Sequence, residues 1–207
     1  MIKLYSVKKT ERILAEYADW IETVSERYAI PSAMIKAVLR KEIAEIDLLD
    51  PVADSLVRFY WLRRRLFGGG TSKRRGILGK HDSSTGCAQI FAYVAINAVG
   101  YALDRGLDDA AGLGLPTDCR PDRANEDDLR AMWLRLKRDR KFNIQMGALN
   151  LISAADEMNG HTDFARYTPE EFRRAFTRYN ANTDHVTAYG KEVYGYYCQY
   201  SDNSVRV

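Results

Sequence analysis

Residues 30–42 read IPSAMIKAVLRKE and end on Glu42, and the interpretation of the rest of the chain starts from this stretch. Pro31 suits the first turn of a helix, because the N–H that proline lacks has no partner there. Met34 and Val38 follow at helical spacing, so an apolar stripe leads to the carboxylate. A carboxyl group at the edge of apolar packing has a raised pKa. The stretch therefore predicts a helical general acid that holds a proton at neutral pH.

Three further segments follow in a set order. Residues 82–90 read DSSTGCAQI, residues 142–151 read FNIQMGALNL, and residues 179–182 read YNAN. Together with the glutamate segment, this motif set resembles the lysozyme-like superfamily of lytic transglycosylases and goose-type lysozymes, over residues 30–197. The resemblance implies a mainly α fold, with a small β-hairpin or irregular region beside an active-site cleft.

The resemblance also implies roles for individual residues. Glu42 matches the general acid/base of the family, and Tyr179 matches the tyrosine that orients this acid. Asn143 and Gly147 match the helix behind the cleft. The implied substrate is peptidoglycan, cut at the β-1,4 bond between N-acetylmuramic acid and N-acetylglucosamine. The residues implied to line the substrate are Ser84, Gly86, Gln89, Tyr179 and Asn180.

Three places depart from the pattern of the family, and one of them is Cys87-Ala88, which stands where the family has Leu-Met. Ile43 stands where the family has Ser or Thr, so a hydroxyl that could contact sugar is missing. Asn182 stands where the family has glycine, which is a mild change because asparagine tolerates positive φ. The Ile43 departure keeps chitin or chitosan open as an alternative substrate.

The reaction type depends on a second carboxylate. Inverting glycosidases place one about 6.5–9.5 Å from the acid to activate water. Lytic transglycosylases use a single glutamate and release a 1,6-anhydro sugar. Asp82 is the main candidate, because goose-type enzymes carry an acidic residue nearby; alternatively, it accepts hydrogen bonds from N–H groups of its own turn. The sequence leaves the choice open, and the other candidates are Glu45, Asp47, Asp50 and Asp54.

Length and composition predict one domain over residues 1–207, with an N-terminal helix in 1–29, a catalytic core in 30–200 and a frayed tail in 201–207. Of the 207 residues, 46% are hydrophobic and 29% are charged, as in ordinary soluble domains. No run of residues approaches the length of a membrane span. Helices are expected over residues 10–28, 31–47, 50–66, 92–105, 125–138, 141–158, 168–179 and 185–200, with irregular or short β structure over 76–90.

The cysteines and histidines give no sign of a cofactor. Cys87, Cys119 and Cys198 are widely spaced and form no Cys-x-x-Cys unit, so we interpret them as small hydrophobic residues. His81, Cys87, His161 and His185 lack the spacing of metal ligands. We therefore expect neither a metal nor another cofactor.

The first nine residues, MIKLYSVKK, carry charge where a signal peptide needs an apolar core. A peptidoglycan enzyme acts outside the cytoplasm. The expectation is therefore non-classical, effector-type or phage-type release.

Two other classes of function are considered. Residues 63–65 and 73–75 are cation runs that could contact nucleic acid, but 28 acidic residues against 31 basic ones argue against that partner. A non-catalytic glycan-binding protein would have little need for Glu42 beside Gln89 and the 179–180 pair. The oligomeric state stays open.

Overall fold

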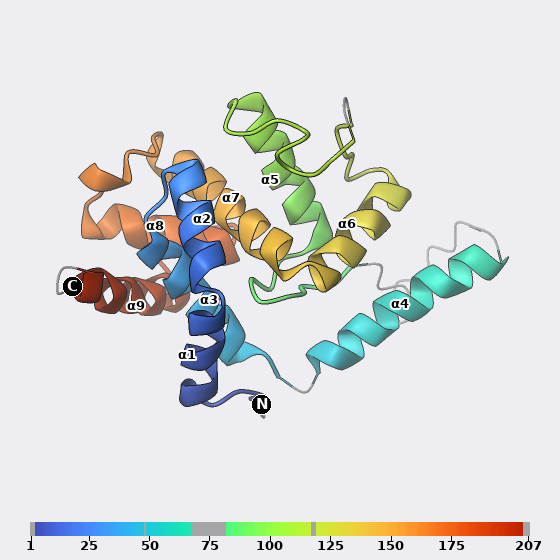
Figure 1. Ribbon diagram of the computed structural model, residues 1–207, viewed down its shortest axis with the longest axis horizontal. Helices are drawn as coiled ribbons and strands as arrows, with labels where there is room; N and C mark the ends of the chain where they lie inside the picture. The colour runs from blue at the N-terminus through green and yellow to red at the C-terminus, as the bar shows by residue number, and fades with distance from the viewer. Residues whose placement is uncertain (1–2, 48, 68–81, 117–118, 205–207) are drawn as a thin grey trace.

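The computed structural model describes residues 3–47, 49–67, 82–116 and 119–204. This part of the chain is mainly helical, as expected, and buried residues from all its α-helices form one hydrophobic core (Figure 1). The helices are α1 (Val7–Glu16), α2 (Ala18–Tyr28), α3 (Ser32–Glu45), α4 (Asp50–Phe67), α5 (Ala92–Asp104), α6 (Glu126–Arg138), α7 (Arg140–Asn159), the 3-10 helix η2 (Phe164–Arg166), α8 (Pro169–Asn180) and α9 (Ala188–Ser204).

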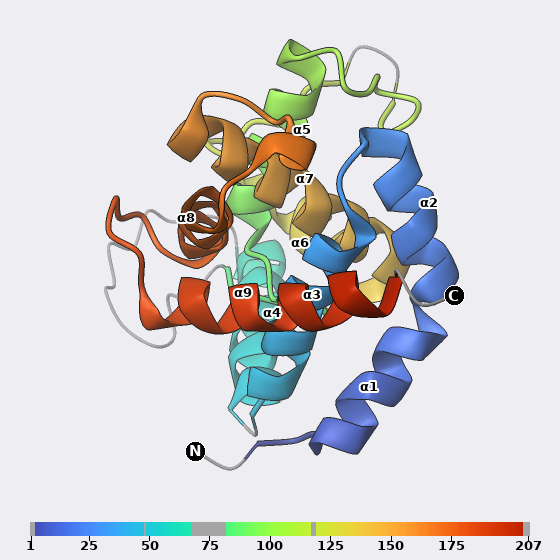
Figure 2. The same ribbon diagram turned by 90° about the vertical axis from the view of Figure 1, so that its left-hand side faces the viewer.

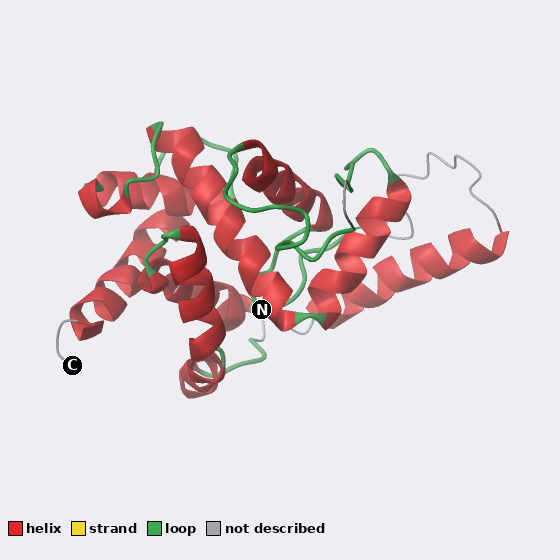
Figure 3. Ribbon diagram, turned by 45° about the horizontal axis from the view of Figure 1, so that its top comes forward, coloured by secondary structure: helices red, strands yellow, loops and turns green. Residues whose placement is uncertain are grey.

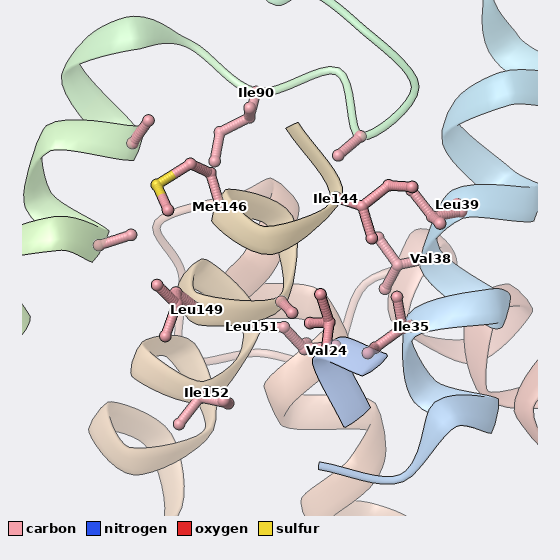
Figure 4. Close-up of a cluster of buried hydrophobic side chains, with 14 of the residues drawn as sticks. Val24, Ile35, Val38, Leu39, Ile90, Ile144, Met146, Leu149, Leu151 and Ile152 are labelled. Atoms are coloured by element: carbon pink, nitrogen blue, oxygen red, sulfur yellow. The ribbon is translucent and has the colours of Figure 1, made fainter. Parts of the chain in front are cut away.

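Helix α7 forms the centre of the fold. Twelve of its twenty residues are buried, so neighbours cover it on most sides. Asp139 caps its start by accepting a hydrogen bond from the Phe142 N–H, and Gly160 ends it in the left-handed conformation. α2, α5, α6 and α8 pack against it. In Figure 4, Ile144 of α7 points toward Val38 and Leu39 of α3.

Helix α3 carries the glutamate stretch and is the second central element. Pro31 precedes its first turn, and nine of its fourteen residues are buried. α9 packs across α3, and Figure 2 shows α9 passing in front of it. A residue on the inner side of α3 therefore faces α9 and the centre of the molecule, which is the setting that the sequence predicted for Glu42.

Most predicted helices are confirmed, with ends that differ by a few residues. The capping box at Thr168 is present, because its side chain accepts from the Glu171 N–H and the Glu171 side chain reaches back. Asn125 caps α6 as expected. None of the described helices is both long and apolar enough to cross a bilayer.

The prediction of one helix over residues 10–28 is wrong. The chain forms α1 and α2, which are separated at Tyr17 with φ −100° and ψ 2°. The Tyr17 ring is buried and stacks on Trp20 at 5.4 Å between centroids. No glycine or proline marks the break, and we attribute it to the packing of this ring.

The small β-hairpin is absent from the described residues, and no strand is drawn in Figure 3. Residues 82–91 take the irregular alternative, with a single bridge between Thr85 and Ile90. Two backbone hydrogen bonds, of 3.2 and 3.3 Å, make this bridge. Residues 76–81 of the predicted region, and 205–207 of the predicted tail, lie outside the described residues.

Candidate active site

A cleft of about 500 Å³ opens between α5, α7, the C-terminal end of α8 and residues 89–91. Its walls are rich in amide, carboxylate and aromatic side chains. Such a surface suits a polar ligand with flat apolar faces. Residues that line it include Glu42, Gln89, Tyr93, Asn97, Asn150 and Asn180.

Glu42 extends from α3 to this cleft and is 9% exposed. The pKa of its carboxyl group is raised from 4.5 to about 7, mainly by burial and to a lesser extent by the nearby charge of Glu45. A hydrogen bond from Tyr189 and the charge of Lys41 act in the opposite direction on this pKa. At neutral pH a substantial fraction of Glu42 therefore carries a proton.

The hydroxyl group that contacts Glu42 belongs to Tyr189 of α9, which donates to Glu42 Oε1. Burial raises the pKa of Tyr189 well above 10, so this donor stays neutral. The next residue, Gly190, lets α9 approach α8 closely, because a Cβ there would lie 2.5 Å from the Arg173 carbonyl oxygen. The sequence analysis did not select Tyr189 as a site residue.

Tyr179, the predicted orienting residue, makes a different contact. Its hydroxyl donates to the Ala88 carbonyl at 2.7 Å. Burial raises the pKa of Tyr179 well above 10, and the charge of Glu42 adds to this shift. Tyr179 therefore fixes residues 82–91 beside the acid, whereas Tyr189 contacts the acid. Asn180 ends α8 and lines the cleft.

Asn143 of α7 anchors the loop that carries the predicted substrate-lining residues. Its Oδ1 accepts from the Ala88 N–H at 2.8 Å, and its Nδ2 donates to the Thr85 carbonyl at 3.0 Å. Gly86 lies between them with φ +75°, and a Cβ there would be 2.2 Å from Asn143 Nδ2. Only glycine fits this turn without moving the amide.

Gln89 stands at the junction of two cavities. It lines the main cleft and also a neighbouring cavity of about 280 Å³, to which Ser84 and Gly86 contribute. Its Nε2 donates to the Gly86 carbonyl at 2.9 Å, and its backbone has φ +43°. The predicted lining residues thus divide between two cavities that meet at Gln89.

Asp82 is 9% exposed and is directed toward the start of α5. Its Oδ1 accepts from the Ala92 N–H at 3.1 Å, and its Oδ2 accepts from the Tyr93 N–H at 3.2 Å. Both oxygens therefore satisfy N–H groups that have no partner within the helix. These two donors belong to the start of α5, ten and eleven residues after Asp82.

Other carboxylates near the site have cationic partners. Glu45 pairs with Lys41 at 2.6 Å, and Asp54 pairs with Lys137. Glu157 lines the cleft and pairs with Arg178. Its Oε1 lies 2.6 Å from Arg178 Nη2, and its Oε2 lies 2.9 Å from Arg178 Nε. The sequence analysis did not predict the Glu157–Arg178 pair. The two residues lie on separate helices, and no sequence motif contains both of them.

The described residues contain no cluster of three or more His, Cys, Asp or Glu side chains arranged to hold a metal ion. Cys87, Cys119 and Cys198 are free thiols. Burial raises the pKa of Cys87 to about 12, so this cysteine is a protonated, packed side chain rather than a nucleophile.

Comparison with protein-family models, curated proteins and solved structures found no match to this chain. The functional argument therefore rests on the motif order and on the geometry around Glu42.

Proposed function

We propose that this protein is a lysozyme-like glycosidase that cleaves the β-1,4 bonds of peptidoglycan, with Glu42 as general acid. The observation that carries the proposal is the Glu42 carboxyl group, which is buried, has a pKa of about 7 and opens onto a cleft. A carboxylic acid that is protonated near neutral pH can protonate the oxygen of a leaving sugar.

The lining of the cleft supports a saccharide ligand. Asn97, Asn150 and Asn180 offer amide donors and acceptors, and Tyr93 presents a ring that is 46% exposed. Sugar hydroxyl and N-acetyl groups pair with amides, and the apolar face of a pyranose stacks on an aromatic ring. An exposed tyrosine in a polar cleft matches both needs.

The length of the hollow surface supports a polymer over a single sugar. The cleft shares Gln89 with the 280 Å³ cavity, and it shares Asn97 and Arg123 with a further cavity of about 410 Å³. These three cavities follow one another along the surface, so several linked sugar units have polar contacts available at once.

The neighbouring carboxylates favour the route with one glutamate. Asp82 accepts two backbone hydrogen bonds, while Glu45 and Glu157 pair with cations. In this route Glu42 gives its proton to the glycosidic oxygen as the C1–O bond breaks. Its carboxylate then takes the proton from the muramic acid 6-hydroxyl, whose oxygen bonds to C1. The product is a 1,6-anhydro sugar, and Tyr189 holds the acid in place throughout.

Mass spectrometry of soluble products from peptidoglycan sacculi tests the proposal. We expect anhydro-muramyl fragments from the wild-type protein, none from Glu42→Gln, and clearly detectable levels from Glu45→Gln, which removes a smaller influence on the pKa of Glu42 than burial. Glu45 is the matched control because it lies one turn further along α3. Reducing-end products would mean a muramidase that uses water.

Absence of products from sacculi would contradict the peptidoglycan assignment. Cleavage of chitin or chitosan by the wild-type protein, but not by Glu42→Gln, would then support Glu42 as the general acid and identify a different glycan as the substrate. Equal activity of wild type and Glu42→Gln on every glycan would overturn the catalytic role. A peptidoglycan substrate also implies action outside the cytoplasm, after non-classical, effector-type or phage-type release.

A further inference from the structure

Helix α4 lies at the edge of the molecule (Figure 1), and one of its faces packs against the core. Val57 and Trp61 on that face are buried in the hydrophobic core. Two ion pairs hold α4 antiparallel to α6, because Asp54 meets Lys137 near the end of α6 and Arg64 meets Glu126 at its start.

The opposite face of α4 carries a second apolar stripe. Four hydrophobic side chains on it are each more than half exposed. With about 100° of rotation per residue, they lie within one quadrant of the helix, opposite Val57 and Trp61. A contiguous exposed stripe of this kind marks an interaction surface, whereas single exposed hydrophobic residues are ordinary. The stripe consists of Val52, Phe59, Leu62 and Leu66.

Cations border the stripe on both sides. On the helical projection Arg58 lies beside Leu62, and Arg63 lies on the other flank beside Val52. Both arginines are exposed. Residues 55–67 contain four arginines and no Asp or Glu, whereas the whole chain has a net charge of only +3. The rest of the chain is therefore net negative, and this part of α4 concentrates positive charge beside the stripe.

We propose that the outer face of α4 docks on an anionic lipid bilayer. Phe59, Leu62 and their neighbours would enter the boundary between head groups and acyl chains, while Arg58 and Arg63 contact lipid phosphates. The inner face of α4 stays packed on the protein, so the helix lies along the bilayer surface. This contact is independent of Glu42 and would bring the protein to a membrane.

Charge and apolarity together select this partner over two others. A nucleic acid would contact the arginines, but its phosphates offer nothing to a stripe of Val, Phe and Leu. A second copy of the chain, paired through a two-fold axis, would bring Arg58 and Arg63 close to their own counterparts. An anionic bilayer satisfies both the apolar stripe and its cationic borders.

Vesicle co-sedimentation of the full chain tests the inference, with two α4 variants. We expect binding to vesicles that contain phosphatidylglycerol and little binding to phosphatidylcholine alone. Arg58→Gln with Arg63→Gln should lower the partition coefficient about 25-fold, since each cation near the surface contributes a factor of about 5. Phe59→Ser with Leu62→Ser should lower it at least about tenfold.

The matched control is Val7→Ser with Lys8→Gln on α1, where an apolar side chain and a cation are equally exposed. This control should bind as the wild type does. Circular dichroism of all variants should be unchanged, because every substituted side chain is exposed.

Three results would overturn the inference. The first is equal binding of wild type and both α4 variants to anionic vesicles, or no binding at all. The second is binding to duplex DNA in place of vesicles, lost with the arginines but not with the apolar pair. The third is a dimer in sedimentation velocity that Phe59→Ser with Leu62→Ser dissociates, without vesicle binding.

Discussion

Two carboxyl groups of this chain are equally buried but accept hydrogen bonds from different kinds of donor. Glu42 and Asp82 are each 9% exposed. Glu42 has one donor, the Tyr189 hydroxyl, and burial raises its pKa to about 7. Asp82 has the Ala92 and Tyr93 N–H groups at the positive end of α5. The difference teaches that equal burial does not give two carboxyl groups the same setting: Glu42 meets one side-chain hydroxyl beside a cleft, whereas Asp82 caps the start of α5.

Substitution of each carboxyl group by its amide gives the largest expected contrast. Glu42→Gln should lower kcat on peptidoglycan about 10³-fold, because the amide has no proton to give to the leaving oxygen. Asp82→Asn should lower kcat by less than about tenfold, because the amide oxygen still accepts from α5. Steady-state release of soluble glycan measures both. A loss of about 10³-fold in both variants would break the comparison and make Asp82 a second catalytic carboxylate.

The pH dependence of stability should show the same contrast without any substrate. Since the pKa of Glu42 is raised on folding, the folded state binds more protons than the unfolded state between pH 4.5 and about 7. The free energy of unfolding should therefore fall as pH rises through this window. Glu42→Gln removes this contribution, so its stability relative to wild type should increase by about 3 kcal/mol between pH 4 and pH 8.

Urea unfolding of wild type and Glu42→Gln at pH 4 and pH 8 measures this effect. Glu45→Gln is the control, and its difference from wild type should be small at both values. If the free energies of unfolding of wild type and Glu42→Gln differed by the same amount at pH 4 and pH 8, folding would not raise the pKa of the Glu42 carboxyl group.

Removal of the two carboxylate oxygens of Asp82 should lower the free energy of unfolding. Asp82→Ala leaves the first N–H groups of α5 unpaired and should lower the free energy of unfolding by about 1–2 kcal/mol. Asn125→Ala, which removes the exposed cap of α6, is the matched control and should cost about 1 kcal/mol or less. Chemical denaturation measures both; an unchanged stability in Asp82→Ala would free this side chain for another role.

The smallest expected effect separates the two tyrosines. Tyr189→Phe removes the donor that lowers the pKa of Glu42, so this pKa should rise. In the proposed mechanism activity requires protonated Glu42 and falls as pH rises through about 7, so the basic limb of the kcat profile should move to higher pH. Tyr179→Phe loses a bond to Ala88 instead and should leave the limb in place. Equal shifts in both variants would contradict the separate roles.

The helices and their ends could be predicted from local sequence, because caps, prolines and apolar spacing act within a few residues. The capping box at Thr168 and the Asn125 cap of α6 are examples. The break at Tyr17 could not, since we attribute it to the packing of one ring and no turn residue marks it.

The residues of the candidate site also differ in how well they could be predicted from local sequence. Glu42 stood out because its own helix supplies the apolar stripe. Tyr189 did not, because it meets Glu42 across 147 residues of chain and only through the crossing of α9 over α3. Asp82 is intermediate, since its donors follow ten residues later but depend on where α5 begins. Predictions from sequence therefore weaken as a partner becomes more distant along the chain.

The fully buried Trp133 has a practical consequence of its own. Its indole N–H donates to the Ser83 hydroxyl at 3.1 Å, so its ring touches the residue next to Asp82. Indole emission moves to longer wavelength when the ring meets water. With Trp20 and Trp61 replaced by Phe, the chain would retain a single tryptophan, and its emission would report whether residues 82–91 are docked. A glycan titration followed by this emission would then read the state of the cleft wall optically, without a label.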